Sequence, residues 1–578
     1  MKLTDALAKV LKLNKIKDVF GLQGGAVVHI FDSIEKIGIN VTYTHHEESA
    51  ALAAVANAKI ENNIGCVVVT TGPASTNAIT GLLAAWQESV PCIFISGQSR
   101  SNHTSYGKKV RQVGTQEVNI CDIVKPLTKK TIFIKHKKYF LKEFYNAIKI
   151  AKEGRQGPVW IDLPLDLQWA EINFTTERKI KIKKNLISKN KKNKLFKLIK
   201  NSIKPILILG YGMRSSKDLI NKVDRFTKKK NIPYVTTWNG ADFFPSSDSL
   251  NLGIIGMSGQ RGANKAIFNS DLIICLGTHL SIPHTTTLYD TYALNAKKII
   301  VNIDQDQLDN LNLKFDLKIK ADLNDFLILL LKLPIKRKKI CKKLLSYKEM
   351  NWYLPKSNNN KPNSDIFIKQ ITKKLFRKSI IVDGGGTALY AGFQSSEIYK
   401  NDRLICSSSI SSMGTGLAET IGVSKNKKYK NLLCIIGDGS FLMNIQDLQT
   451  IFQYKLNVII LVVNNNGYLA IRNTQKEFLN KRYFGTHPDW NLQMPNISKL
   501  SKAFGINYIK VSNSKNLEKK IDKIIKLKRP LICELVVDEN QQSLFKQGYL
   551  KVSKNKFSPQ PLSEMYPFLE QPIANTNN

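Results

Sequence analysis

The chain has 578 residues, a hydrophobic fraction of 43% and 33 glycines, which excludes a disordered protein and predicts several domains, because one core rarely serves so long a chain. No apolar run reaches the ~20 residues of a membrane helix, and the eight cysteines form no CxxC pair. We therefore expect a protein of the reducing cytoplasm, with no membrane partner and no zinc or disulfide framework.

The net charge of +42 is the one abnormal total, and taken alone it suggests a nucleic-acid ligand. The lysines, however, are spread along the whole chain beside many asparagines and isoleucines, a pattern typical of biased surface composition. We found no RNP, helix-turn-helix or zinc-finger pattern. We therefore expect no nucleic-acid partner, and keep a basic nucleic-acid binder as an alternative of a different class.

Short β-branched runs that end in Gly or Asp recur along the chain and predict strands of doubly wound parallel sheets. The N-terminal MKLTDALAKVLKL is amphipathic and predicts a first helix rather than a signal peptide. Strand-like runs then follow at 65–73 and 91–98, at 204–212, 270–278 and 297–304, and at 378–386, 431–439 and 456–467. The lysine-rich stretch 178–200 and the polar stretch 354–365 separate these groups, and we interpret the first as a solvated linker.

This grouping predicts an α/β protein of three doubly wound parallel-sheet domains, over residues 1–177, 195–335 and 360–545, followed by a tail over 546–578. The tail after Leu544 is polar and contains prolines, so we expect an extended arm or a lid. Ligands of such sheets bind outside the carboxyl ends of the strands. Functional residues should therefore lie just after the strand-like runs.

The strongest motif is GDGSFLMNIQDLQTIFQYKLNVIILVVNNNGY. A buried strand over 432–436 leads into Gly437-Asp438-Gly439, a helix follows, and a second buried strand ends at Asn464-Asn465-Asn466-Gly467. Two adjacent parallel strands would place Asp438 and Asn465 together at one sheet edge. Mg²⁺ takes oxygen ligands and usually only one or two carboxylates, so Asp438, Asn465 and the carbonyl near Gly467 predict a magnesium site. Gly437, Gly439 and Ser440 would let the backbone and a helix N-terminus approach a diphosphate.

The stretch THHEESAALAAVANAK at 44–59 allows three interpretations. Metal binding is a poor one, because four adjacent residues cannot converge on one ion from a helix. Helix capping is sufficient for Glu48, since acidic residues near a helix N-terminus favour the dipole. The third interpretation makes Glu47 a catalytic carboxylate. His45, His46, His279 and His284 are each expected to be structural, with His46 a modest exception because it precedes Glu47.

The GDG motif, followed after 24 residues by the NN pair, resembles the thiamine-diphosphate (ThDP) motif. About residues 1–545 are similar to the acetolactate synthase (acetohydroxyacid synthase large subunit) family, and most similar to a subgroup of polysaccharide-locus type. The segments that carry this resemblance are VFGLQGGAV (19–27), HHEESAALAA (45–54), TTGPASTNAITGL (70–82), SVPCIFISGQ (89–98), GRQGPVWIDLPLDLQ (154–168) and SSMGTGLAETIG (411–422).

The resemblance implies roles for particular positions. Glu47 would hydrogen-bond the pyrimidine ring of ThDP, Gln98 would face the reactive centre, and Met413 would hold the cofactor in its bent conformation. The further cofactor contacts implied are Gly24, Pro73, Asn77, Gly385, Gly386 and Thr387. In this family the Glu47 and Asp438 positions of one site belong to different subunits, which implies a homodimer or homotetramer.

The implied activity is decarboxylation of pyruvate, or a related 2-oxo acid, with transfer of the hydroxyethyl unit to a second carbonyl, as in branched-chain amino acid biosynthesis. Two positions depart from the family: Thr474 replaces a tryptophan of the acceptor pocket, and Pro283 replaces an arginine that receives the acceptor carboxylate. A guanidinium pairs a carboxylate bidentately and proline cannot. A nucleotide-linked keto-sugar of surface polysaccharide synthesis is therefore the alternative acceptor. A non-catalytic protein on the same fold is the alternative of another class.

FAD is left open. GYGMRSS (210–216), GMSGQRGAN (256–264), VNIDQD (301–306) and Arg155 keep the outline of the family's central domain, in which FAD has a structural role. The altered segment THLSIPHTT (278–286), by contrast, removes support for a flavin.

Overall fold

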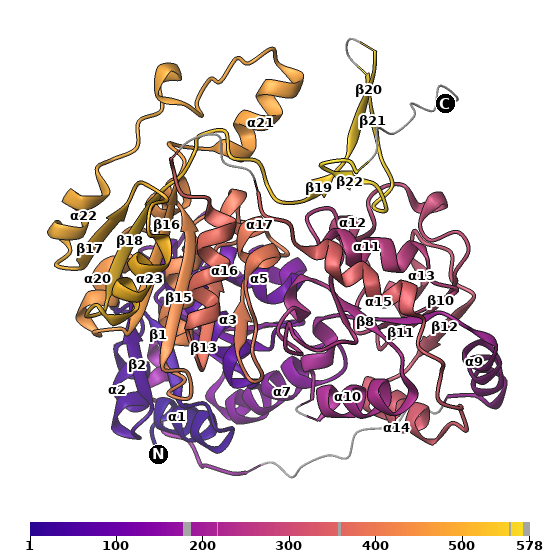
Figure 1. Cartoon of the computed structure of the whole chain (residues 1–578). Coiled ribbons are helices and arrows are strands. Elements are labelled where there is room, and N and C mark those ends of the chain that lie inside the picture. The colour runs from indigo at the N-terminus through magenta and orange to yellow at the C-terminus, as the bar shows by residue number, and fades with distance from the viewer. Residues whose placement is uncertain (177–186, 217, 356–359, 554–555, 570–578) are drawn as a thin grey trace.

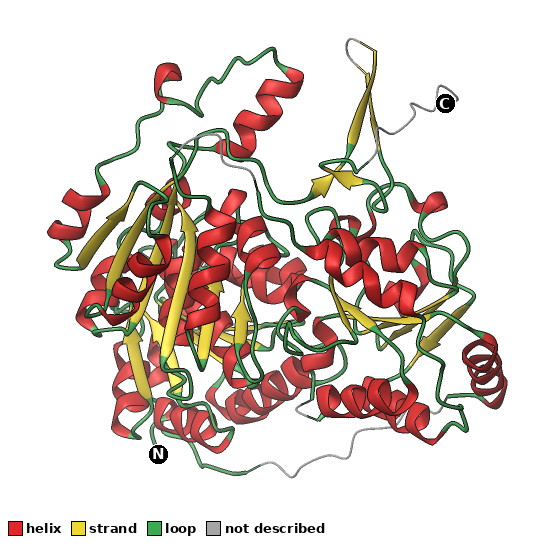
Figure 2. Ribbon diagram, viewed as in Figure 1, coloured by secondary structure: helices red, strands yellow, loops and turns green. Residues whose placement is uncertain are grey.

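The computed structural model describes residues 1–176, 187–216, 218–355, 360–553 and 556–569. Its architecture is three six-stranded sheets, every one of them parallel throughout and covered by helices on its faces (Figures 1 and 2). The predicted fold class is confirmed.

The first sheet has the strand order β2-β1-β3-β4-β6-β5. Its central strands are buried along their whole length, as expected for a parallel sheet with helices on both faces. The strands are β1 (Asp18–Gly21), β2 (Asn40–Tyr43), β3 (Gly65–Val69), β4 (Cys92–Gln98), β5 (Lys130–Phe133) and β6 (Val159–Pro164); the helices are α1 (Leu3–Leu13), α2 (Val28–Lys36), α3 (Glu47–Glu61), α4 (Pro73–Asn77), α5 (Ile79–Gln87), α6 (Ile120–Val124), α7 (Phe140–Lys152) and α8 (Leu165–Gln168).

The second sheet has the order β12-β11-β10-β7-β8-β9 and forms the right-hand part of the molecule in Figure 1. Its strands are β7 (Pro205–Leu209), β8 (Tyr234–Thr236), β9 (Asn251–Ile254), β10 (Leu272–Leu276), β11 (Lys297–Asn302) and β12 (Leu317–Lys320); its helices are α9 (Lys189–Asn201), α10 (Leu219–Lys230), α11 (Arg261–Phe268), α12 (Ile282–Thr285), α13 (Gln305–Asp309), α14 (Leu323–Lys332) and α15 (Lys342–Ser346).

The third sheet has the order β14-β13-β15-β16-β18-β17. Its strands are β13 (Lys378–Val382), β14 (Arg403–Ile405), β15 (Asn431–Gly437), β16 (Val458–Asn464), β17 (Asn507–Val511) and β18 (Leu531–Val536); its helices are α16 (Ser364–Lys374), α17 (Gly386–Ser395), α18 (Thr415–Val423), α19 (Asp438–Met443), α20 (Asp447–Gln453), α21 (Leu469–Phe478), α22 (Ile497–Ala503) and α23 (Leu517–Lys526).

Helix α3 joins the first and third sheets into one body, because it packs on both α5 of the first and α18 of the third. Its alanine-rich sequence fits this position: apart from Glu48 and Glu61, every residue of the helix is buried, and small side chains let neighbouring helices approach closely. Residues from both sheets consequently belong to one hydrophobic core, which contains Phe20 and Phe94 together with Ile436 and Ile460.

The expected solvated linker over 178–200 was wrong in its second half. Residues 177–186 lie outside the described residues, but α9 begins at Lys189 and packs against the second sheet. Leu195 and Ile199, four residues apart, are fully buried, so one apolar stripe suffices to dock a helix whose other faces are lysine-rich.

The tail forms two small antiparallel pairs, β19 (Lys546–Gln547) with β22 (Met565–Tyr566) and β20 (Tyr549–Ser553) with β21 (Lys556–Pro559). The β20–β21 hairpin stands away from the body in Figure 1. The first pair is anchored to the second sheet's helical layer, where Asn264 Nδ2 lies 3.0 Å from Met565 Sδ. In the described part of the chain, no helix has the length and apolarity to cross a membrane.

Candidate functional site

The first group of predicted site residues lies at the carboxyl edge of the third sheet. Strands β15 and β16 are adjacent and in register, with Gly437 beside Val463, so Asp438 and Asn465 follow the ends of neighbouring strands. Both side chains are buried, with 3% and 4% of their surface exposed. The sequence prediction that these two residues come together at one sheet edge is therefore met by the fold.

Asp438 is held by backbone donors. Its Oδ2 accepts the Gly467 N–H at 2.8 Å and its Oδ1 accepts the Gly439 N–H at 3.0 Å. Burial raises the pKa of Asp438 to about 6, although these N–H groups and nearby Arg472 oppose the rise. A buried carboxylate of this kind is relieved of its desolvation cost by a bound cation.

The Asn465 amide is only half satisfied. Its Nδ2 donates to the Thr387 hydroxyl at 3.1 Å, whereas its buried Oδ1 has no hydrogen-bond partner among the described residues. Buried polar atoms are normally paired, and an amide oxygen is a ligand that Mg²⁺ accepts. The Asp438 carboxylate and this free oxygen therefore fit a divalent cation.

Arg472 fixes the loop around these residues and was missed by the sequence analysis. Its guanidinium donates to the carbonyls of Asn465 (2.6 Å), Asn466 (2.9 Å) and Thr486 (2.8 Å). Gly467 has φ = +118° and a Cβ there would lie 2.7 Å from the Thr486 carbonyl, so this position requires glycine. No spacing in the sequence links Arg472 to the carbonyls that it binds.

Asp383 is a second missed residue, at the end of the neighbouring strand β13. It is fully buried, and its carboxylate accepts the N–H groups of Gly416 (3.0 Å) and Gly385 (3.3 Å). Burial raises the pKa of Asp383 to about 6, with Ser440 among the groups that lower it. Asp383 lies within the strand-like run predicted at 378–386, directly after the residue at which β13 ends, and an acidic residue at that point could have identified it.

Gly385 is the N-cap of α17, and Gly386 and Thr387 are its first residues; this turn lies beside Met413. A Cβ on Gly385 would lie 2.5 Å from Met413 Cγ, so the glycine allows the methionine to pack against this turn. Gly386 has φ = +76°, which favours glycine. A Cβ on Gly437 would meet nothing within 4 Å, whereas one on Gly439 would meet the Tyr468 ring at 2.2 Å. The backbone at Gly437, next to Asp438, therefore has free space in front of it that a ligand could approach.

Glu47 is the first residue of α3 and is 8% exposed. Its Oε2 accepts a hydrogen bond from Asn77 Nδ2 at 3.0 Å, so two of the predicted residues contact each other. The capping residue of the helix is His46, whose Nδ1 accepts the Glu48 N–H at 3.2 Å, so the histidine expected to be a modest exception makes a helix-capping contact. No hydrogen bond joins Glu47 to Asp438 within the described residues of this chain.

Gln98 ends β4 and is 1% exposed. Its Nε2 donates to Asp162 Oδ2 and to the Val118 carbonyl, both at 2.9 Å, and its Oε1 accepts from the Thr71 hydroxyl at 2.8 Å and the Ser99 N–H at 2.9 Å. All four hydrogen-bonding positions of the amide are filled by the protein.

Asp162, on the neighbouring strand β6, is the centre of this network and is fully buried. It also accepts from the hydroxyls of Ser96 (2.6 Å) and Tyr106 (3.0 Å). Burial raises the pKa of Asp162 to about 7 against the effect of these donors. Asp162 lies within the family-like segment 154–168, but the resemblance implied no role for it.

The remaining predicted residues of the first sheet lie in its strand-end loops. Gly24 packs on Thr70, because a Cβ there would lie 2.5 Å from that side chain. Pro73 and Asn77 are the first and last residues of the short helix α4 and are exposed. They stand on the same side of the sheet as Glu47, at the carboxyl ends of its strands.

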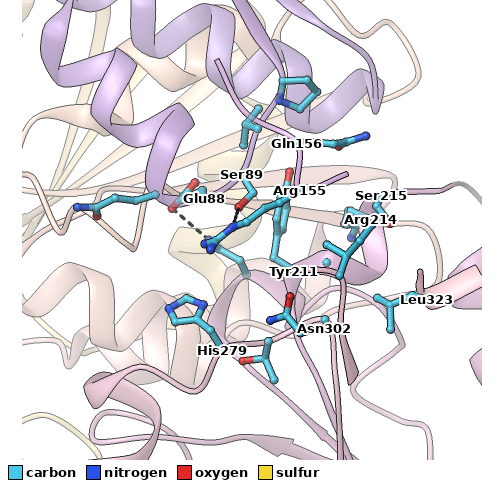
Figure 3. A pocket seen from close by; sticks show the side chains of 18 of the residues that line it. Glu88, Ser89, Arg155, Gln156, Tyr211, Arg214, Ser215, His279, Asn302 and Leu323 are labelled. Atoms are coloured by element: carbon cyan, nitrogen blue, oxygen red, sulfur yellow. Dashed lines mark hydrogen bonds between the residues drawn. The ribbon is translucent and has the colours of Figure 1, made fainter. Parts of the chain in front are cut away.

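A separate cavity of about 390 Å³ lies between the first and second sheets (Figure 3). Arg155 lines it and bonds Ser89 Oγ (2.9 Å), Asp304 (3.2 Å) and Gln307 (3.3 Å). Segments 211–215, 277–279 and 301–303 also line it. The cavity is therefore lined by Arg155 and by parts of two predicted central-domain segments, 210–216 and 301–306. Pro283, His279 and His284 border an adjoining cavity of about 500 Å³.

Comparison with known proteins agrees with this geometry. Thiamine pyrophosphate enzyme models match as the N-terminal TPP binding domain over 1–123, the central domain over 193–330 and the C-terminal TPP binding domain over 384–535. The chain thus belongs to the thiamine pyrophosphate enzymes.

Its relatives include acetolactate synthase large subunits from Cyanidium caldarium (31% identical over 561 residues, 92% of each chain), Haemophilus influenzae (28% over 559, covering 93% and 94%) and Lactococcus lactis (30% over 548, covering 93% and 92%). Within the thiamine pyrophosphate enzymes, the chain is a member of the acetolactate synthase large-subunit family. The family predicted from the sequence motifs is confirmed.

Proposed function

We propose that this chain is a ThDP- and Mg²⁺-dependent carboligase that decarboxylates pyruvate, or a related 2-oxo acid, and transfers the two-carbon unit to a second carbonyl. The observation that carries the proposal is the pairing of the buried Asp438 carboxylate with the free Asn465 Oδ1 at adjoining strand ends. These lie within the part of the chain that matches the family's C-terminal TPP binding domain.

The residues present fit the cofactor. Asp438, Asn465 and the backbone carbonyl of Gly467 would hold Mg²⁺, with two oxygen side chains and room for phosphate oxygens. The diphosphate would be received by Gly437, Gly439, Ser440, Gly385, Gly386 and Thr387, and Met413 would pack against the bent cofactor. When bound, ThDP supplies the carbanion chemistry.

Glu47 is proposed to hold a proton at the ring nitrogen of the aminopyrimidine. Asn77 fixes one carboxyl oxygen at 3.0 Å, so the other oxygen can face a ligand. Since no bond joins Glu47 to the Asp438 end in the described chain, we propose that a homodimer, or a homotetramer built from it, completes each site.

The roles of Gln98, Gly24 and Pro73 are retained as proposals. Because the Gln98 amide already makes four hydrogen bonds, it would have to exchange one partner to contact a substrate. We also propose that the protein is located in the cytoplasm. The proposed domains span residues 1–177, 195–335 and 360–545.

The test compares wild type with Glu47→Gln. Both should bind ThDP only when Mg²⁺ is present, because the metal residues are unchanged, while CO2 release from pyruvate should fall at least 100-fold in the variant, within the range attributed to proton transfer. Titration calorimetry and a CO2 assay measure the two quantities. Glu61→Gln, at the other end of α3, is the matched control. Full turnover in Glu47→Gln would remove the catalytic assignment.

The second substrate is open between two classes. Acetolactate formation is favoured by the relatives, whereas a nucleotide-linked keto-sugar is favoured by the cavity border at Pro283, which also contains Trp86, Trp238 and Lys129. Indole rings and a cation suit a base and a phosphate better than a small oxo acid. CO2 release with pyruvate alone, yielding acetolactate by mass, supports the first class; release that needs the sugar supports the second.

FAD is proposed as the occupant of the cavity around Arg155. The Arg155 and Arg214 guanidinium groups lie on its walls, and cations of this type recognise phosphates. Protein purified from cells grown with riboflavin should carry a flavin absorbance band that is lost in Arg155→Ala. Protein without the band, and without uptake of added FAD, would contradict this part of the proposal.

A further inference from the structure

Asp447 is a buried carboxylic acid that the proposed mechanism does not use. It is the first residue of α20 and has 0% of its surface exposed. Neither carboxyl oxygen forms a hydrogen bond of ordinary geometry with another described residue. An ionised carboxylate in such a place would bear a desolvation cost of several kcal/mol, so this group needs either a partner or a proton.

The carboxyl faces the start of α3. Ser49, fully buried, lies close enough to lower the pKa of Asp447, and Glu48 lies close enough to raise it. Gln446 Nε2 reaches Ser49 Oγ at 3.5 Å. The residue that precedes α20 therefore contacts the first turn of α3, so the starts of these two helices, from the third and first sheets, lie together.

Neutral amides hold the rest of this contact. Asn444 Oδ1 accepts from Gln446 Nε2 at 2.9 Å, and Asn444 Nδ2 donates to the Gly414 carbonyl at 3.0 Å. The Asn444 side chain also lowers the pKa of Glu48, against the larger effect of burial, which raises it. Gly414 directly follows Met413, so the contact reaches from the helix that carries Glu47 to the turn that carries Met413.

The charges around the pair are few. His46 lies near Glu48 and lowers its pKa. Helix α18, which also packs on α20, has Glu419 as its one titratable residue, and that carboxyl is turned to Lys59 and Ser407. No cation neutralises Asp447 among the groups that shift its pKa, which burial raises to about 7. The carboxyl of Glu48 raises the pKa of Asp447 further, because neighbouring like charges oppose each other's ionisation.

We propose that Glu48 and Asp447 hold one proton between them, and that this pair positions Glu47 by keeping the starts of α3 and α20 in contact. The inference rests on the proposed role of Glu47, because it assigns the pair no contact with substrate or cofactor. Loss of the shared proton would place two negative charges between the helix ends, move the first turn of α3, and displace the Glu47 carboxylate that begins it.

Infrared difference spectra of the full-length protein between pH 5 and pH 9 test the proton directly. Wild type should lose a protonated-carboxyl band as the pH rises, and this band should be absent from Asp447→Asn. In Glu48→Gln the midpoint of the band should shift to lower pH, because the repelling charge is gone. Asp162→Asn is the matched control. It should remove only the protonated-carboxyl band of Asp162 and leave the Asp447 band, which responds to Glu48.

The pH profile of CO2 release tests the positioning. Wild-type kcat should fall at alkaline pH as the pair ionises, and Asp447→Asn, which cannot ionise, should lack that fall while KM for pyruvate stays within two-fold. An alkaline fall that survives in Asp447→Asn, or an infrared midpoint unmoved by Glu48→Gln, would overturn the inference. Wild type that releases no CO2 would instead contradict the proposed function. The infrared spectra would still show whether Asp447 carries a proton and whether Glu48 affects it.

Discussion

Lys59 illustrates how single residues hold the three sheets together. Its side chain is 2% exposed, and its ammonium forms an ion pair with Glu88 and lies 3.9 Å from Glu419. It also donates to the Cys406 carbonyl at 2.9 Å. Glu88 in turn accepts from Asn239 of the central region at 3.1 Å. One buried cation therefore connects α3, the end of α5, the third sheet and the second.

Replacing Lys59 with Met should lower the free energy of unfolding by about 3–5 kcal/mol, because one charge of a buried pair is left without its partner. The double variant Lys59→Met/Glu88→Gln should lose less, since the carboxylate of the closest ion pair is removed together with the ammonium. Denaturant unfolding measures both. Lys36→Met, which removes an exposed ion pair with Asp32, is the control and should change little. Equal losses in the single and double variants would contradict the interpretation.

Residues that act through contacts far apart in sequence were the hardest to predict. Asp438 and Asn465 could be named because strand ends are readable from local patterns, whereas Glu47 was named through the resemblance of its segment to the family. Arg472 and Asp162 could not, because their partners lie on loops and strands whose proximity only the folded chain defines. The filled hydrogen bonds of Gln98 were likewise invisible in the sequence.

At the scale of elements, α3 is enclosed by two helices that approach through glycines. A Cβ on Gly422 of α18 would lie 2.0 Å from the Ala53 carbonyl oxygen, and one on Gly81 of α5 would lie 2.4 Å from Ala51 Cβ. Asn57 of α3 donates to the Gly422 carbonyl at 3.3 Å. The contact is thus made backbone to backbone.

Gly422→Ala should destabilise the protein by about 1–3 kcal/mol, because the added methyl group forces α18 away from α3. Thermal unfolding followed by circular dichroism should show a lower Tm. Gly25→Ala is the matched control, since a Cβ there meets nothing within 4 Å. An unchanged Tm for Gly422→Ala would mean that the two helices are less tightly packed than the structure indicates.

The strands named from the sequence were predictable because they are continuous apolar runs whose ends bear Gly, Asp or Asn; they correspond to β3, β4, β7, β10, β11, β13, β15 and β16. The ten other strands of the three sheets were not named. Helix α9 was also missed, because its many lysines concealed a stripe made by Leu195 and Ile199, too sparse to stand out from a solvated stretch. A helix docked by so few apolar residues carries a weak periodic signal. The pairs β19–β22 and β20–β21 also had no clear signature in a tail rich in polar residues.

At the scale of the whole molecule, several buried carboxyl groups make folding depend on pH. Burial raises the pKa of Asp162 and Glu419 to about 7, and that of Asp365 to about 6. Each group binds its proton more tightly when folded than when unfolded. The stability it contributes is therefore fully present below the unfolded pKa, near 4, and is lost as the pH rises through the folded value.

The free energy of unfolding of wild type, relative to Asp162→Asn, should fall between about pH 4 and pH 7 and level off above that. The difference between the two free energies of unfolding is used because both proteins experience the same charge repulsion from a net charge of +42, which then cancels. Asp365→Asn should show the same fall, ending near pH 6. Denaturant unfolding at a series of pH values measures these differences. A relative stability that rises over this range would contradict the buried, protonated state.

The core shared by the first and third sheets has a consequence for how the polypeptide can be divided. Its apolar residues come from both ends of the chain, while the central sheet is inserted between them in sequence. Breaking one peptide bond within a central loop would leave the two outer thirds attached by noncovalent contacts alone. Two separately expressed pieces that meet at such a break should reassemble into the native body, whereas either outer third by itself would expose half of a hydrophobic interior to water.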